Sequence, residues 1–130
     1  MCLENVIKEI EEDDELRWGY GYKVMNRCCN GKITPPVFGS EGVNIGNKST
    51  AINGLVWTDS RDMCYKFGFH IFLELDDAKL YHHYLGLPIN SILVKVAYTQ
   101  GRLLGKQYIG RGSMADCIIA DRIKYLEIVK

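Results

Sequence analysis

The last third of the chain, residues 90–130, constrains the fold most, because strand-forming segments follow one another there. The segment NSILVKVAYT (90–99) is rich in β-branched residues and predicts a strand. The segments GRLLGKQYIG and ADCIIADRIKYLEIVK predict one or two short strands and a final long one. A region of this kind needs partner strands, so a mainly β architecture is expected.

Upstream segments supply these partners. WGYGYKVMNRCC predicts a strand that opens at Trp18, and AINGLVW (51–57) predicts another. FGFHIFLEL (67–75) predicts a strand whose successive side chains point to opposite faces, with Phe69 on one face and His70 on the other. DDAKLYHHYLG (76–86) predicts a helix, because acidic residues fill its first turn and a glycine and a proline follow its end.

The N-terminal segment, residues 1–15, has a different pattern. Leu3, Val6, Ile7 and Ile10 recur at helical spacing and predict one apolar stripe of a short amphipathic helix. Residues 4–15 hold seven acidic residues and one lysine, a charge of −6, so the rest of a chain with zero net charge carries +6. The acidic run is either a solvated helix end or a segment that pairs with the basic body, within one subunit or between two.

The order of elements predicts an α+β fold with a mainly antiparallel sheet, an N-terminal helix and one further helix. At 130 residues a single domain is expected, with an acidic amphipathic helix over 1–15 and an α+β body over 16–130. No apolar run approaches the roughly 20 residues that span a membrane, and the acidic N-terminus is unlike a signal peptide. A cytoplasmic protein is therefore expected.

Sequence signatures of enzymes are missing from the chain. It has no phosphate-binding loop, no dinucleotide-binding glycine motif, no zinc-protease motif and no nucleophile elbow. The five cysteines include no C-x-x-C pair, so no metal site is expected and the thiols are interpreted as reduced. These observations favour a binding protein without a cofactor over a catalyst.

Arginines are the residues best suited to hold an anion, because a guanidinium can bond a phosphate through two N–H groups at once. Arg111 stands between two glycines in GRGS, where Ser113 adds a hydroxyl. This segment is either a tight turn or the anion-gripping part of a site. Arg27, at the end of a predicted strand, is a second candidate phosphate clamp.

Four further residues are candidates for the rest of a nucleotide-shaped ligand. Trp18 and Phe72 are candidate stacking surfaces for a base. His70 and Asn90 are candidate partners of a ribose or base, although a histidine on a strand between phenylalanines also suits the core. The body lacks the strongly basic stripe of a polynucleotide binder, so a small phosphate-bearing ligand is expected.

The segments GYKVM, GFHIF, LDDA, ILVKVAY and GRGSMADCIIADRIKYLEI, in this order over residues 16–130, resemble the first anti-Thoeris family of phage nucleotide sponges. The resemblance implies a non-enzymatic trap for cyclic ADP-ribose isomers, which bacterial TIR-domain defence proteins make. It also implies that some members bind cyclic oligonucleotides, and hence act against Thoeris-type and CBASS-type defence. Dimers or higher homo-oligomers in the host bacterial cytoplasm follow from it, with no long nucleic acid and no membrane as partner.

Two other readings stay open from the residues alone. One is an enzyme that acts on an NAD-derived or ADP-ribosyl ligand, for which Glu74 is the candidate acid. The other is a protein-interaction module that uses the acidic N-terminal segment to bind a basic partner.

Overall fold

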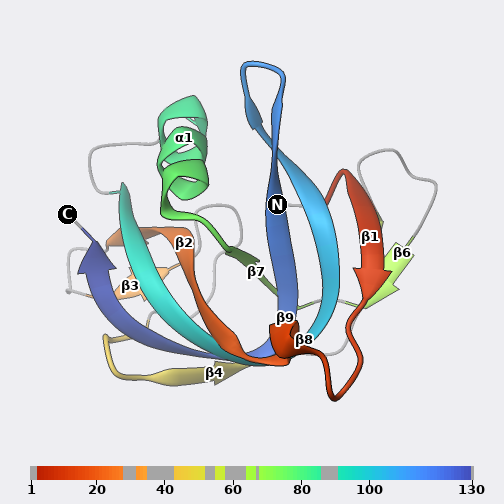
Figure 1. Ribbon diagram of the computed structural model, residues 1–130. Helices are drawn as coiled ribbons and strands as arrows, with labels where there is room; N and C mark the ends of the chain where they lie inside the picture. Colours follow the sequence, from red (N-terminus) through yellow and green to blue (C-terminus); the bar gives the residue numbers. More distant parts are fainter. Residues whose placement is uncertain are drawn as a thin grey trace.

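The computed structural model describes residues 3–27, 32–34, 43–51, 55–57, 64–66, 68–85 and 91–129. In this part of the chain the strands form a large antiparallel sheet and a separate two-stranded pair, and there is one α-helix (Figure 1). The sheet strands are β1 (Asn5–Glu9), β2 (Gly19–Arg27), β3 (Ile33–Thr34), β4 (Lys48–Thr50), β7 (Phe69–Phe72), β8 (Ser91–Gly110) and β9 (Ser113–Val129). The pair consists of β5 (Leu55–Trp57) and β6 (Cys64–Lys66), and the helices are α1 (Leu75–Leu85) and the 3-10 turn η1 (Glu15–Arg17).

The sheet closes on itself through its two longest strands. Its order is β1-β8-β2-β7-β9-β4, and β8 also pairs with β9, so β2, β7, β9 and β8 form a ring. At 20 residues β8 is several times longer than a typical strand, which lets its first half pair with β2 and its second half with β1. The β8–β9 pair has register shifts between Lys95 and Val96 and between Gly101 and Leu103, and the second falls where β8 passes from β2 to β1. Both long strands are bent (Figure 1).

Two apolar clusters form the core, and each ring strand contributes to both. One cluster also holds the buried face of α1, which contacts β8, β2 and β7. Its buried members are Leu3, Val24, Tyr65, Phe72, Ala78, Tyr81, Leu93, Leu103, Ile109, Ala115, Cys117 and Ile119. The buried members of the other cluster are Ile10, Met25, Ile33, Ile71, Val94, Val96, Tyr98, Ile118, Ala120, Ile123 and Tyr125.

The fold agrees with the expected α+β class and mainly antiparallel sheet. The helix predicted over 76–86 is confirmed by α1, and the predicted alternation in 67–75 is confirmed because Ile71 and Phe72 lie in different clusters. The strand predicted over 90–99 continues to Gly110. No helix in the described ranges has the length and apolar character to cross a membrane.

The predicted N-terminal helix is wrong. Residues 5–9 form strand β1, which pairs antiparallel with Leu103–Lys106 of β8. A helical stripe would bury Ile7 together with Leu3 and Ile10, but Ile7 is 48% exposed while Leu3 is 0% and Ile10 is 6% exposed. The open edge of β8 offers backbone hydrogen bonds that a short amphipathic helix cannot replace, and this tertiary pairing overrides the local periodicity.

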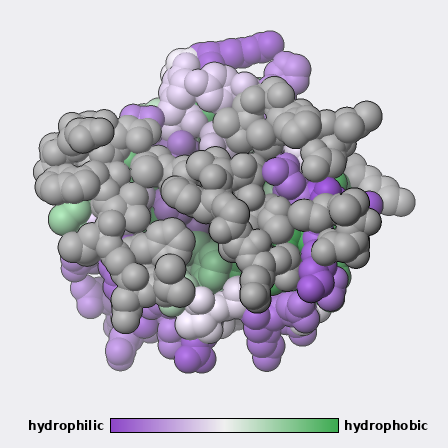
Figure 2. All heavy atoms as spheres, turned by 180° about the vertical axis from the view of Figure 1, so that it is seen from behind, coloured by the Kyte–Doolittle hydropathy of each residue, from purple (hydrophilic) through white to green (hydrophobic). Residues whose placement is uncertain are grey.

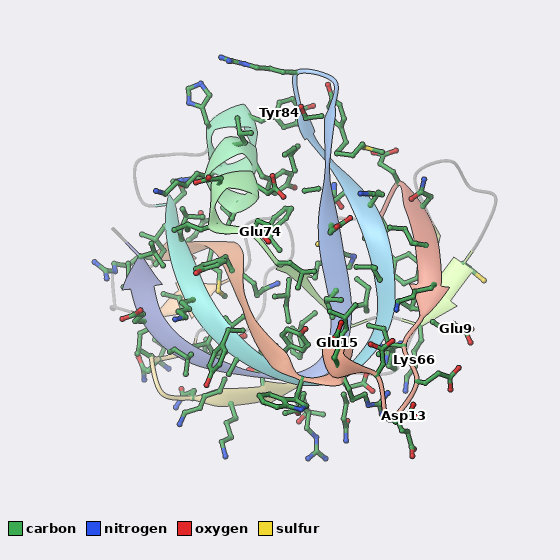
Figure 3. All side chains as sticks on the ribbon, viewed as in Figure 1. Glu9, Asp13, Glu15, Lys66, Glu74 and Tyr84 are labelled. Carbon is green, nitrogen blue, oxygen red and sulfur yellow. The ribbon has the colours of Figure 1, made fainter. Side chains whose placement is uncertain are left out.

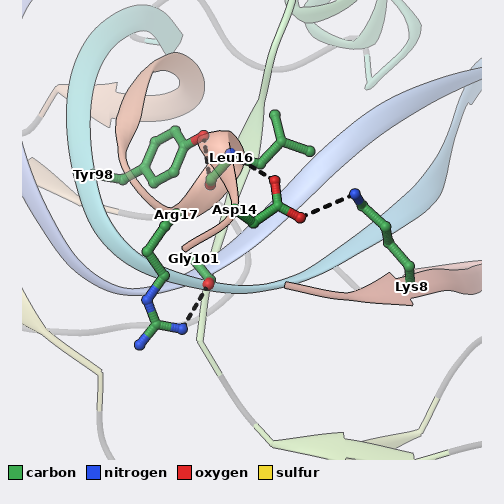
Figure 4. Close-up of polar contacts among 6 residues, drawn as sticks. All are labelled: Lys8, Asp14, Leu16, Arg17, Tyr98 and Gly101. Atoms are coloured by element: carbon green, nitrogen blue, oxygen red, sulfur yellow. Dashed lines mark hydrogen bonds and ion pairs between the residues drawn. The ribbon is translucent and has the colours of Figure 1, made fainter. Parts of the chain in front are cut away.

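The centre of the acidic run, residues 11–14, lies in the connection from β1 to η1, and η1 is hydrogen-bonded to the sheet at several points (Figure 4). The carboxylate of Asp14 accepts from the backbone N–H of Leu16 and forms an ion pair with Lys8 at 3.0 Å. Arg17 donates to the carbonyl of Gly101 at 3.1 Å, and the Tyr98 hydroxyl donates to the carbonyl of Leu16 at 3.2 Å. These bonds set the direction in which the chain enters β2.

Candidate functional site

The GRGS segment is the tip of the β8–β9 hairpin. Gly110 pairs with Ser113, which leaves Arg111 and Gly112 as a two-residue turn. Both turn residues have positive φ, 53° for Arg111 and 72° for Gly112, as in a type I′ hairpin turn. The first position of such a turn favours glycine, which has no Cβ, and asparagine or aspartate, whose short polar side chains tolerate positive φ, whereas other side chains strain the backbone there.

Turn geometry alone therefore gives no reason for an arginine at position 111. The side chain of Arg111 is exposed, so packing gives no reason either. Strained residues that neither the turn nor the core requires are concentrated at functional sites. The tip of the hairpin is thus the first place to look for a ligand.

Two tyrosines hold the tip against the C-terminal end of α1. The ring of Tyr84 (Figure 3) lies over Gly110 so closely that a Cβ there would be 2.5 Å from the ring. It meets the ring of Tyr108 edge-on, with 5.4 Å between the ring centres and 87° between the planes. The Tyr108 hydroxyl accepts from the backbone N–H of Gly112 at 3.2 Å. Because Tyr84 is still 52% exposed, part of its ring is open beside Arg111.

The surface around the hairpin tip is partly apolar, whereas the N-terminal end of α1 is negatively charged. Leu80 and Met114 are 41% and 42% exposed and add apolar surface on the helix and on β9. At the N-terminal end of α1, burial and the neighbouring carboxylates of Glu74 and Asp116 raise the pKa of Asp77. Negative charge is thus gathered at the far end of α1, away from Arg111.

Phe72 and His70 lie in the core. Phe72 is 0% exposed and its ring packs 5.1 Å from that of Tyr81. His70 is 6% exposed, and its Nε2 lies 2.9 Å from the hydroxyl of Tyr65, which accepts from the backbone N–H of Leu3. Burial and the nearby Lys23 lower the pKa of His70 to about 3, so this histidine is neutral.

A buried amine lies beside this histidine. Lys23 is 9% exposed and donates from Nζ to the carbonyl of His70 at 2.8 Å. Burial lowers the pKa of Lys23 to about 8. The thiol of Cys117 is also buried, which raises its pKa to about 12 and leaves it a poor nucleophile at neutral pH.

The remaining candidates are separate from the tip. Arg27 is exposed at the end of β2, where it pairs with Ile33 of β3. Trp18 is 67% exposed between η1 and β2. Asn90 lies outside the described residues.

Of the residues proposed from sequence, Arg111 and Ser113 are therefore brought together, and the fold adds Tyr84 and Tyr108. Tyr108 alternates with buried neighbours in β8, so its side of the strand could be predicted from the sequence. No sequence pattern indicates that α1 lies beside the hairpin. An exposed guanidinium, a hydroxyl and an open tyrosine ring can hold an anion attached to a flat ring. Comparison of the chain with models of known protein families, with curated proteins and with solved structures found no match.

Proposed function

We propose that this protein is a non-enzymatic binder of a small nucleotide anion, with its site at the tip of the β8–β9 hairpin. The observation that carries the proposal is Arg111, an exposed arginine with φ of 53° in a turn that favours other residues. Strain that contributes nothing to folding is retained when the side chain has another task.

Each group at the tip has a distinct role in this proposal. The guanidinium of Arg111 bonds phosphate oxygens in pairs, and the Ser113 hydroxyl donates one further bond. The open part of the Tyr84 ring stacks on the base, while Tyr108 holds Tyr84 and the turn in place. None of these groups has to give up or take a proton, which suits a protein that holds its ligand intact.

The resemblance to the anti-Thoeris sponge family supplies the identity of the ligand in this proposal. It favours cyclic ADP-ribose isomers, with cyclic oligonucleotides as the second class. A phage protein of this kind inhibits Thoeris-type or CBASS-type defence by sequestering the signal in the host cytoplasm, as a homo-oligomer. The rest of the proposal depends on the tip alone.

The test is Arg111→Asn, measured by native mass spectrometry and calorimetry against cyclic ADP-ribose isomers, cyclic dinucleotides and cyclic trinucleotides. Asparagine tolerates positive φ, so we expect the free energy of unfolding to stay the same or to rise by up to about 1 kcal/mol. The melting temperature should accordingly be unchanged or higher. Loss of a charge-assisted bidentate contact should weaken binding by about 1.5–3 kcal/mol, roughly 10-fold or more.

Arg27→Gln is the matched control, since Arg27 is an exposed arginine on another element and should leave binding unchanged. Unchanged affinity in Arg111→Asn would refute the site. Ligand recovered after denaturation of the complex must be intact and stoichiometric. A converted product would instead support the enzyme reading.

A further inference from the structure

A second surface is assembled by the register of four strands. Tyr20 of β2 pairs with Ala97 of β8, Ala97 pairs with Lys124 of β9, and Lys124 pairs with Lys48 of β4. Residues directly opposite one another in antiparallel strands point to the same face of the sheet. One transverse row therefore runs from an aromatic ring on β2, across a small residue, to two lysines.

The neighbouring rows have the same arrangement. Thr99 of β8 pairs with Arg122 of β9, which pairs with Thr50 of β4. On the other side Tyr22 pairs with Lys95. We call the exposed part of this sheet surface the outward face, and its members are Trp18, Tyr20, Lys95, Ala97, Thr99, Arg122, Lys124, Lys48, Thr50 and Glu127. Tyr22, which packs against the core cluster that holds α1, marks its border.

The outward face is open and has two chemically different halves. Between these positions, Val96, Tyr98, Ile123 and Tyr125 point the other way into the core. On the β2 side Trp18 is 67% and Tyr20 is 60% exposed, so two large rings stand in water without covering the core. Hydrophilic side chains line the lower border of Figure 2, the side on which β4 and the paired halves of β8 and β9 lie in Figure 1.

The charge of the outward face is strongly positive. It holds four cations, Lys48, Lys95, Arg122 and Lys124, against the single carboxylate of Glu127. Among the described residues the ion pairs involve Lys8, Arg102 and Lys106, so none of these four cations forms an ion pair with a described carboxylate, although Glu127 lies opposite Lys95. Lys95 lies over the ring of Tyr20 at 5.4 Å from its centre, where the two halves meet.

Exposed rings beside unpaired cations on a sheet are the arrangement that binds single-stranded nucleic acid, because bases stack on the rings and the backbone follows the cations. We propose that the outward face binds a single-stranded polynucleotide. Bases lie over Trp18 and Tyr20, and phosphates lie over Arg122, Lys124 and Lys48. This function goes beyond the proposed sponge activity and does not depend on the hairpin tip. It departs from the sequence-based expectation of no long nucleic acid, because strand register rather than a basic run in the sequence brings these cations together.

The dimensions of the sheet agree with this placement. Strands lie about 4.8 Å apart, so Tyr20 and Lys124, two strands apart, are separated by about 10 Å across the sheet. Trp18 and Tyr20 are two residues apart along an extended chain, about 7 Å, which lets two bases each use one ring. The side chains of Ala97 and Thr99 are small, so the sheet surface between the rings and the cations leaves room for a nucleotide backbone. A duplex would keep its bases away from the rings.

The acidic segment of a second copy is the competing occupant. Glu9 and Asp13 lie toward one side of the molecule, with Glu15 nearer the middle of the view (Figure 3). These carboxylates could neutralise the cations of a neighbour. Carboxylates do not stack on aromatic rings, so this occupant would give the exposed rings of Trp18 and Tyr20 no binding partner. A polynucleotide uses both halves of the outward face.

The experiment is fluorescence anisotropy of the full-length chain with 12-nucleotide oligo(dT) and oligo(U), from 50 to 300 mM salt. Three phosphate contacts predict that log K falls with log salt with a slope of about −2. Tyr20→Ala should weaken binding about 5- to 150-fold, and Lys124→Gln should make the slope shallower by about 0.7. The ratio of the two affinities tells whether RNA or DNA is preferred.

Two controls separate this site from the hairpin tip and from simple charge. Arg111→Asn and Lys79→Gln, which alter exposed cations elsewhere, should leave oligonucleotide binding unchanged. A 12-base-pair duplex and inorganic polyphosphate should compete at least 10-fold less well than oligo(dT).

No binding at 50 mM salt would overturn the proposal, as would polyphosphate competing equally while Tyr20→Ala binds like the wild type. Sedimentation velocity, which measures the oligomeric state, tests whether a second copy of the chain occupies the outward face instead. Loss of a dimer in Lys124→Gln, without oligonucleotide binding by the wild type, would assign the outward face to a second copy.

Discussion

Replacing the buried Lys23 by methionine should stabilise the protein at neutral pH, although it removes a hydrogen bond. The pKa of this amine falls from 10.5 to about 8 because burial disfavours its charged form. At 1.36 kcal/mol per pH unit, keeping the amine charged at pH 7 costs about 3 kcal/mol. Removing the hydrogen bond from Lys23 to the carbonyl of His70 destabilises the variant by about 1 kcal/mol, so its net stabilisation is about 2 kcal/mol.

The pH dependence is the sharper part of this prediction. Between pH 8 and 10.5 the unfolded chain binds more protons than the folded one, so the wild type gains stability as pH rises. The advantage of Lys23→Met should therefore be constant below pH 8 and then shrink by about 1.4 kcal/mol per pH unit. Above pH 10.5 it should change sign, because only the lost hydrogen bond, about 1 kcal/mol, then separates the two proteins.

Urea unfolding of both proteins at pH 7, 8, 9 and 10 measures this difference, and titrations common to both proteins cancel. Lys79→Met on the exposed side of α1 is the control, because it removes a cation without removing a buried one. A stability advantage of Lys23→Met that stays constant from pH 7 to 10 would refute the reasoning. If Lys23 deprotonates near pH 8 in the folded state, the advantage must shrink above that pH.

Two further changes test other parts of the fold. Asp77→Asn should raise the melting temperature at pH 7 because burial and nearby carboxylates raise the pKa of Asp77. The wild type then loses stability as pH rises from 3.8 through the folded pKa, so thermal scans should show the advantage disappearing below about pH 3.8. Leu3→Ala should cost about 2–5 kcal/mol and Ile7→Ala less than about 1 kcal/mol in urea unfolding, since Leu3 is 0% and Ile7 48% exposed. Equal losses would favour an N-terminal helix over strand β1.

Local patterns in the sequence predicted the elements whose signals lie within a few residues. The acidic first turn and the glycine after the last turn marked α1, and alternation placed Ile71 and Phe72 on opposite faces. The N-terminal segment shows where such reasoning stops. Its spacing of Leu3, Val6, Ile7 and Ile10 suits a helix, but the free edge of β8 turns it into a strand.

The two proposed binding surfaces depend on contacts between distant parts of the chain. Arg111 and Ser113 are neighbours in any fold, but Tyr84 reaches them only because α1 packs against the hairpin. His70 and Phe72 looked usable for a ligand because alternation assigns faces without saying which face is covered.

The sequence by itself determined the mainly antiparallel α+β class and the helix α1, because these follow from side-chain size, charge and backbone preference over a few residues. It left the GRGS segment open between a turn and a binding loop, and it predicted an N-terminal helix where the chain forms β1. Only the tertiary structure decided that Tyr20, Lys124 and Lys48 form one row. These residues lie far apart along the chain, and no basic run announces them. Strand register joins them, and register is set by the burial of the opposite face across the whole sheet.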